Sequence, residues 1–86
     1  MATHKSARKR ARQAIKRRTR NRDLRTRTKG AVKRVRAALE TNDAEGARSS
    51  LRAAESVLRR AVSKGALPRK RASRLIGRLA HHASNL

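Results

Sequence analysis

The sequence predicts an all-α protein, an antiparallel three-helix bundle with a long basic first helix projecting beyond the bundle. Apolar residues recur at steps of three and four in three separate segments, as one face of a helix requires, and no stretch has the alternation of a half-buried strand. Turn-forming residues interrupt helix-favouring sequence near residues 42 and 65. The 86 residues suit a single domain, with a basic segment at about 5–29 and a bundle at about 30–86.

The first helix is expected from about residue 6 to residue 40, a length of roughly 50 Å at 1.5 Å per residue. Its apolar stripe begins late, and it consists of Leu24, Thr28, Ala31, Val32, Val35 and Leu39. Gly30 lies near the junction, where it permits a bend or is simply a tolerated or closely packed glycine. The simpler interpretation, without a bend, is preferred.

The second helix is expected to begin at the turn around residue 42, because Asn42 and Glu45 resemble a capping pair. Its end is predicted at Lys64 and Gly65, since Gly65 is free to adopt a positive φ. The apolar stripe between these points comprises Ala44, Ala47, Leu51, Ala54, Leu58 and Ala61, widened by Val57 and Val62.

The third helix is expected to carry Pro68 in its first turn, where the missing amide donor costs nothing. Its apolar stripe is Ala72, Leu75, Ile76, Leu79 and Ala83. Three such stripes joined by short connections predict that the second half of the first helix packs on the other two helices.

Charge is the strongest functional signal, since 26 basic and five acidic residues give a formal net charge of +21. Thirteen of the first 29 residues are Lys or Arg, and they point in every direction around a helix. A helix that lies on a membrane confines its basic residues to one side, so this pattern does not predict a membrane partner. It is typical of a helix surrounded by phosphates, as in folded RNA. Residues 69–78 offer a second basic surface, whereas residues 37–58 carry a net charge of −2.

The residue types favour recognition of RNA shape and backbone. Arginine outnumbers lysine 19 to seven, and its planar guanidinium binds phosphate through two hydrogen bonds. Aromatic residues for base stacking are absent. A histone-like or nucleoid DNA-condensing basic protein is the alternative, and spacing alone leaves a helix-turn-helix open.

Other classes of function find little support in the sequence. No nucleophile stands beside a base and no Gly-rich phosphate loop occurs, so we predict that the protein is not an enzyme and uses no cofactor. His4, His81 and His82 lack cysteine partners and metal-pair spacing, which predicts no metal site. Neither a membrane span nor a secretory signal is expected.

The opening residues resemble the bacterial small-subunit ribosomal protein S20 family, through MATHKSARKRARQ at 1–13 and KRRTRNR at 16–22. The resemblance covers essentially the whole chain. It implies a cytoplasmic structural protein of the small ribosomal subunit that binds directly to small-subunit ribosomal RNA and stabilises its folded form during assembly. The implied partners are the 5′ domain of that RNA, its long helix near the decoding region, and other ribosomal components; no small-molecule substrate is implied.

The resemblance also carries RNA-binding positions over to this chain: His4, Lys5, Ser6, Lys9, Arg10, Arg12, Arg17, Arg18, Asn21 and Arg22. Charge patterning adds Lys16, Arg20, Arg25, Arg69, Arg74 and Arg78. The basic side chains are expected to bind phosphates, and Ser6 and Asn21 to bond phosphate or sugar. The family usually has a His-Lys-Asn run at the start of the third helix, where this chain has Pro68, Arg69 and Lys70.

Overall fold

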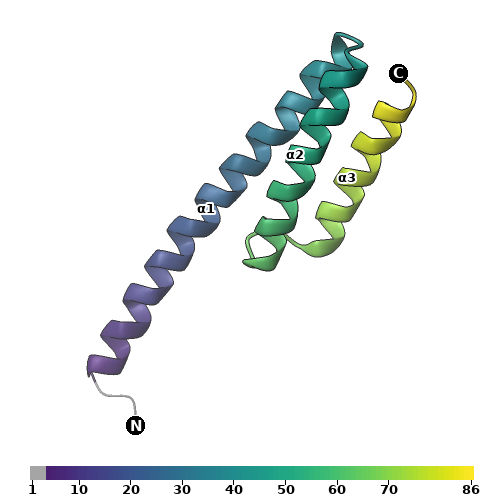
Figure 1. Cartoon of the computed structure of the whole chain (residues 1–86). Helices are drawn as coiled ribbons and strands as arrows, with labels where there is room; N and C mark the ends of the chain where they lie inside the picture. Colours follow the sequence, from purple (N-terminus) through teal and green to yellow (C-terminus); the bar gives the residue numbers. More distant parts are fainter. Residues whose placement is uncertain (1–3) are drawn as a thin grey trace.

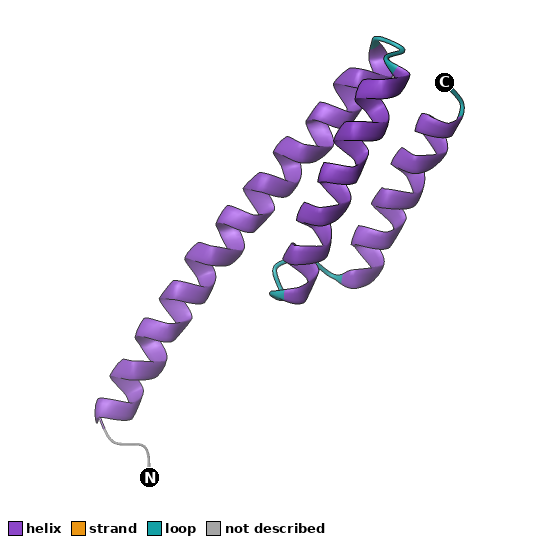
Figure 2. Ribbon diagram, in the orientation of Figure 1, coloured by secondary structure: helices purple, strands orange, loops and turns teal. Residues whose placement is uncertain are grey.

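The computed structural model describes residues 4–86, and it contains the three helices that the sequence predicts (Figure 1). They are α1 (His4–Glu40), α2 (Ala44–Ser63) and α3 (Arg69–Ser84). Figure 2 shows helices and short connections but no strand in the described part of the chain, which confirms the all-α prediction. Residues 1–3, which belong to the opening that carries the family resemblance, lie outside the described residues.

The molecule is elongated because α1 is almost twice as long as α2. Its 37 residues correspond to about 55 Å of helix, close to the 60 Å length of the molecule. The radius of gyration is 17.2 Å, against roughly 12 Å for a compact chain of this length. Only the second half of α1 runs beside α2, and the first half projects from the bundle, as predicted (Figure 1).

The core consists of small and branched aliphatic side chains contributed by all three helices. Val35 of α1 and Leu58 of α2 are fully buried, and Leu79 of α3 is buried beside Val35. Ala47, Ala54 and Ala61 of α2 are all 0% exposed and follow one another at intervals of seven. Because alanine has only a methyl group, this row lets α2 approach its neighbour closely, and the most extensive helix contact is the one between α1 and α2.

Packing of α1 begins at Leu24, which is buried against Ala61, Ala66 and Leu67. The sequence placed the start of the bundle near residue 30, and burial of Leu24 extends the packed part toward the N-terminus. Gly30 lies inside an uninterrupted helix, and an added Cβ would have no neighbour within 4 Å. Gly30 is therefore a tolerated glycine that neither bends α1 nor permits a close contact.

The turn between α1 and α2 uses a different cap from the predicted one. Asp43 is the N-cap residue, and its side chain accepts a hydrogen bond of 3.0 Å from the Gly46 amide. The Asn42 prediction is wrong by one residue, because Asn42 has a φ of 55° and reverses the chain instead. Asn tolerates this left-handed conformation better than most residues.

The end of α2 is a Schellman motif, which fixes the direction of the chain toward α3. Gly65 has the predicted positive φ, at 75°. The Ala66 amide donates to the Ala61 carbonyl at 2.8 Å, and the Gly65 amide donates to Val62 at 3.0 Å. Pro68 is the N-cap of α3 and not a residue of its first turn, since the helix begins at Arg69.

Candidate nucleic-acid interface

The projecting half of α1, residues 4–23, has almost no tertiary packing. All residues from 7 to 20 are exposed, including Ile15 at 60%. Only Ser6 and Asn21 in this half are partly buried. The predicted RNA-binding residues that are exposed in this half are His4, Lys5, Lys9, Arg10, Arg12, Lys16, Arg17, Arg18, Arg20 and Arg22.

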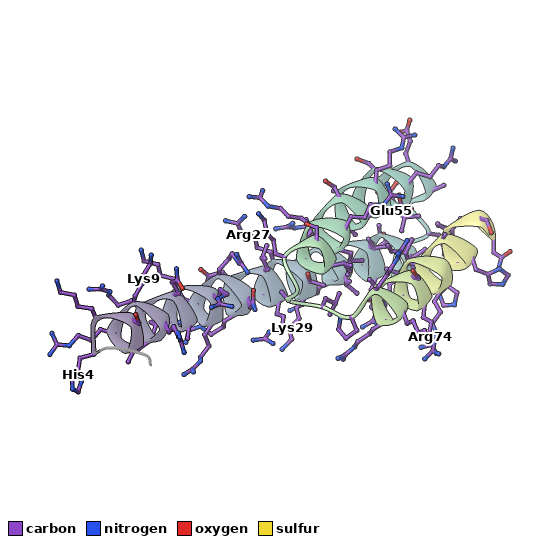
Figure 3. The ribbon with its side chains drawn as sticks, turned by 90° about the horizontal axis from the view of Figure 1, so that it is seen from below. His4, Lys9, Arg27, Lys29, Glu55 and Arg74 are labelled. Carbon is purple, nitrogen blue, oxygen red and sulfur yellow. The ribbon has the colours of Figure 1, made fainter. Side chains whose placement is uncertain are left out.

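These side chains surround the helix. Consecutive residues differ by about 100° in direction, so Lys16, Arg17 and Arg18 point to three sides. In Figure 3 the side chains of His4 and Lys9 extend to opposite sides of α1. A flat anionic surface would contact only the basic side chains on one side of the helix, whereas phosphates converging from several directions would contact all of them.

Arg20 has a structural partner in addition to its predicted role. Its Nη2 atom donates to the Lys64 carbonyl oxygen at 3.0 Å and to Asn21 Oδ1 at 3.3 Å. The Lys64 carbonyl stands at the C-terminal end of α2, where the helix dipole is negative. Arg20 therefore links the projecting half of α1 to the loop between α2 and α3.

A groove of about 1130 Å³ separates α1 from α3, which touch each other much less than either touches α2. Its α1 wall carries Arg25, Lys29, Lys33 and Arg36. Its α3 wall carries Lys70, Arg71, Arg74 and Arg78. Every charged side chain along the groove is therefore basic.

The structure brings three of the predicted residues, Arg25, Arg74 and Arg78, into this groove, whereas Arg69 is exposed outside it. The predicted set omitted the other five groove cations, Lys29, Lys33, Arg36, Lys70 and Arg71. Their spacing was the available signal, because basic residues recur every three or four positions on both helices. In Figure 3, Lys29 and Arg74 extend to the same side of the molecule, and Arg27 extends to the opposite side.

The acidic residues lie mostly at the other end of the molecule. Glu40, Asp43 and Glu45 surround the turn between α1 and α2, far along α1 from its projecting half (Figure 1). Glu55 is on α2, and Asp23 is the one acid among residues 4–23. The charge is thus polarised along the long axis, with the most basic part projecting.

The described residues also bear on two other kinds of site, a metal centre and a membrane span. Among residues 4–86, no group of three or more His, Cys, Asp or Glu side chains is arranged to hold a metal ion. None of the described helices has the length and apolar character that a membrane crossing requires.

Comparison with known proteins identifies the family. Residues 2–84 match the model of Ribosomal protein S20. Small ribosomal subunit protein bS20 of Desulfovibrio desulfuricans is 50% identical over 86 residues, covering 100% of this chain and 97% of that protein. The protein of the same name from Maridesulfovibrio salexigens is 53% identical over 79 residues, covering 92% of this chain and 91% of that protein. These matches confirm the resemblance seen in the opening residues and give no support to the DNA-condensing alternative: the chain belongs to the ribosomal protein S20 family of the small ribosomal subunit.

Proposed function

We propose that this protein binds directly to small-subunit ribosomal RNA and stabilises its folded form during assembly of the subunit. The observation that carries the proposal is the projecting half of α1, in which exposed basic side chains surround a helix that has no apolar face. Such a helix is suited to a site enclosed by RNA, because each phosphate backbone meets cations whichever side it approaches from. The relatives are named as proteins of the small ribosomal subunit, which supports this partner.

The role that fits these residues is structural and not catalytic. The bundle holds one end of α1, and the projecting half supplies the charge that draws RNA segments together. Neutralising phosphates that repel one another lowers the free energy of the compact RNA. The protein would act in the cytoplasm, within the small subunit and among its other components.

The finer proposal concerns which RNA is bound. The family resemblance favours the 5′ domain of small-subunit ribosomal RNA and the long helix near the decoding region. The proposed contacts in the projecting half are the ten residues carried over by the resemblance together with Lys16 and Arg20, and Arg25, Arg69, Arg74 and Arg78 complete the predicted set. Ser6 and Asn21 are proposed to bond phosphate or sugar.

Competition binding tests the proposal. Labelled transcript of the 5′ domain is bound to the full chain at a fixed salt concentration, and unlabelled 5′-domain RNA, RNA from another domain and duplex DNA compete at equal nucleotide concentration. We expect the 5′-domain RNA to compete best, and duplex DNA to compete at least tenfold less well. Equal competition by duplex DNA would instead favour a general condensing protein.

A further inference from the structure

We propose that the groove between α1 and α3 is a second RNA site, which holds one phosphodiester strand of the folded RNA along its length. This inference rests on the proposed function and goes beyond it, because it assigns a one-sided site on the bundle, separate from the enclosed projecting half. It adds five residues that lie outside the set of predicted RNA contacts: Lys29, Lys33, Arg36, Lys70 and Arg71.

The two walls of the groove present cations in regular rows. On α1 the basic residues follow at steps of four, four and three, from Arg25 to Arg36. On α3 they follow at steps of four, from Lys70 through Arg74 to Arg78. A step of four places neighbouring cations about 6 Å apart along the helix. The chain reverses direction at both turns, so α1 and α3 run parallel (Figure 1). Both rows line the same groove.

Apart from these cations, the lining of the groove is mostly apolar and carries no counter-charge. It includes Val32 of α1, Leu75 of α3 and Leu67 of the connecting loop. Cations facing one another across a groove repel, and the cost falls only when an anion comes between them. A phosphate strand supplies such anions at regular intervals, and the arginines can grip it through two hydrogen bonds each.

The charges outside the two rows also favour the groove as the face that binds RNA. The acids at the turn between α1 and α2 lie outside the groove, and no acid lines it. Arg22 and Arg25 continue the basic surface of the projecting half toward the groove. One RNA strand could therefore be followed by positive charge from the projecting half onto the bundle.

Lysine acetylation of the full chain, with and without the 5′-domain transcript, tests the two sites separately. Four of the seven lysines report on the two sites. Lys9 and Lys16 lie in the projecting half, and Lys29 and Lys33 lie in the groove. We expect mass spectrometry to show at least fivefold slower modification of all four in the complex, and of Lys70 as well. Protection of Lys9 and Lys16 alone would overturn the groove site and leave the proposed function standing. Protection of none would contradict both.

A matched pair of variants gives an independent test. The groove variant carries Lys33→Gln, Arg74→Gln and Arg78→Gln, and the control carries Arg48→Gln, Arg52→Gln and Arg59→Gln on exposed positions of α2. Both remove three charges, so a general loss of positive potential affects them alike. We expect the groove variant to bind the transcript at least tenfold more weakly and to lower the slope of log affinity against log salt by about two to three, since each lost phosphate contact contributes about 0.7–0.9. The control should keep the wild-type slope.

Circular dichroism of the free variants guards against misfolding. Removing facing cations from exposed positions should leave the thermal midpoint of the groove variant unchanged or raise it. A folded groove variant with the affinity and the salt slope of the control would overturn the proposal.

Discussion

The two halves of α1 are one continuous helix, yet they are held by different forces. Residues 24–40 bury Leu24, Val32 and Val35 against the other helices, whereas residues 4–23 bury no large apolar side chain. The first half also carries ten basic residues and one acid, a net charge of +9 in 20 residues. Like charges on neighbouring turns destabilise a helix, and an isolated helix of this length is marginal in water. The packed half supplies a ready helix end from which the projecting half propagates.

The two halves of α1 therefore have different roles: residues 24–40 serve folding, and residues 4–23 serve binding. Packing of apolar side chains decides the structure of the bundle. The projecting half contributes little to folding and offers nearly half of the chain's net charge of +21 to an external anion. We therefore expect substitutions in the two regions to have effects of different kinds.

The largest expected effect is the loss of RNA affinity when the projecting half is neutralised. A variant with Gln at six predicted contacts keeps good helix formers but loses six cations. The substituted residues are Lys9, Arg10, Arg12, Arg17, Arg18 and Arg22. If all six bind phosphate, the salt slope should fall by about four to five, and the affinity at moderate salt at least a thousandfold. Filter binding across a salt series measures both.

The thermal midpoint of this variant is the control, because the bundle is unchanged and should unfold as before. The three-charge α2 variant provides a second control when losses are compared per charge removed. Equal losses per charge would mean that the projecting half has no special role.

The next largest effect is on the free energy of unfolding. It is seen when a large apolar side chain is truncated to alanine in the bundle and, for comparison, in the projecting half. Leu58→Ala removes a fully buried side chain from the bundle and should lower the free energy of unfolding by about 2–5 kcal/mol. Ile15→Ala removes a side chain that is 60% exposed and should change it by less than about 0.5 kcal/mol. Urea unfolding followed by circular dichroism measures both. A large loss for Ile15→Ala would show that the projecting half packs in solution.

Much of this division could be predicted from sequence, because it depends on periodicity and charge along the chain. The stripe beginning at Leu24 and the positive φ of Gly65 are local patterns with local causes. The N-cap was placed one residue early because Asn42 and Asp43 are both good caps, and only the path of the chain decides which one reverses it.

The groove could not be predicted in the same way. Rows of basic residues on α1 and α3 are visible in the sequence, but their facing positions depend on how α2 orients both helices. The hydrogen bond between Arg20 and the Lys64 carbonyl joins residues 44 positions apart, and no local pattern marks it. Contacts between distant segments of the chain therefore account for what sequence reasoning missed.

A smaller effect is the response of the free protein to salt. Screening shortens the range of repulsion to about 10 Å at 0.1 M salt, so added salt should stabilise the helix over residues 4–23. The same salt weakens RNA binding, and the two quantities should move in opposite directions. Amide exchange should be fast in residues 7–20 of the free protein, several-fold slower at high salt, and slower still with RNA bound. Strong protection of residues 7–20 at low salt without RNA would contradict this coupling.

The smallest expected effect tests the link between the two regions. Arg20→Gln removes the hydrogen bond to the Lys64 carbonyl, and because the site is exposed the free energy of unfolding should fall by less than about 1 kcal/mol. Arg18→Gln removes the same charge from the same half of α1 without removing that bond, so it isolates the role of the bond. We expect faster amide exchange near the α2–α3 loop in the Arg20 variant only. If both variants lose RNA affinity equally but only Arg20→Gln loosens the loop, Arg20 serves both regions; if neither loosens it, the projecting half is joined to the bundle by the α1 backbone and the burial of Leu24 alone.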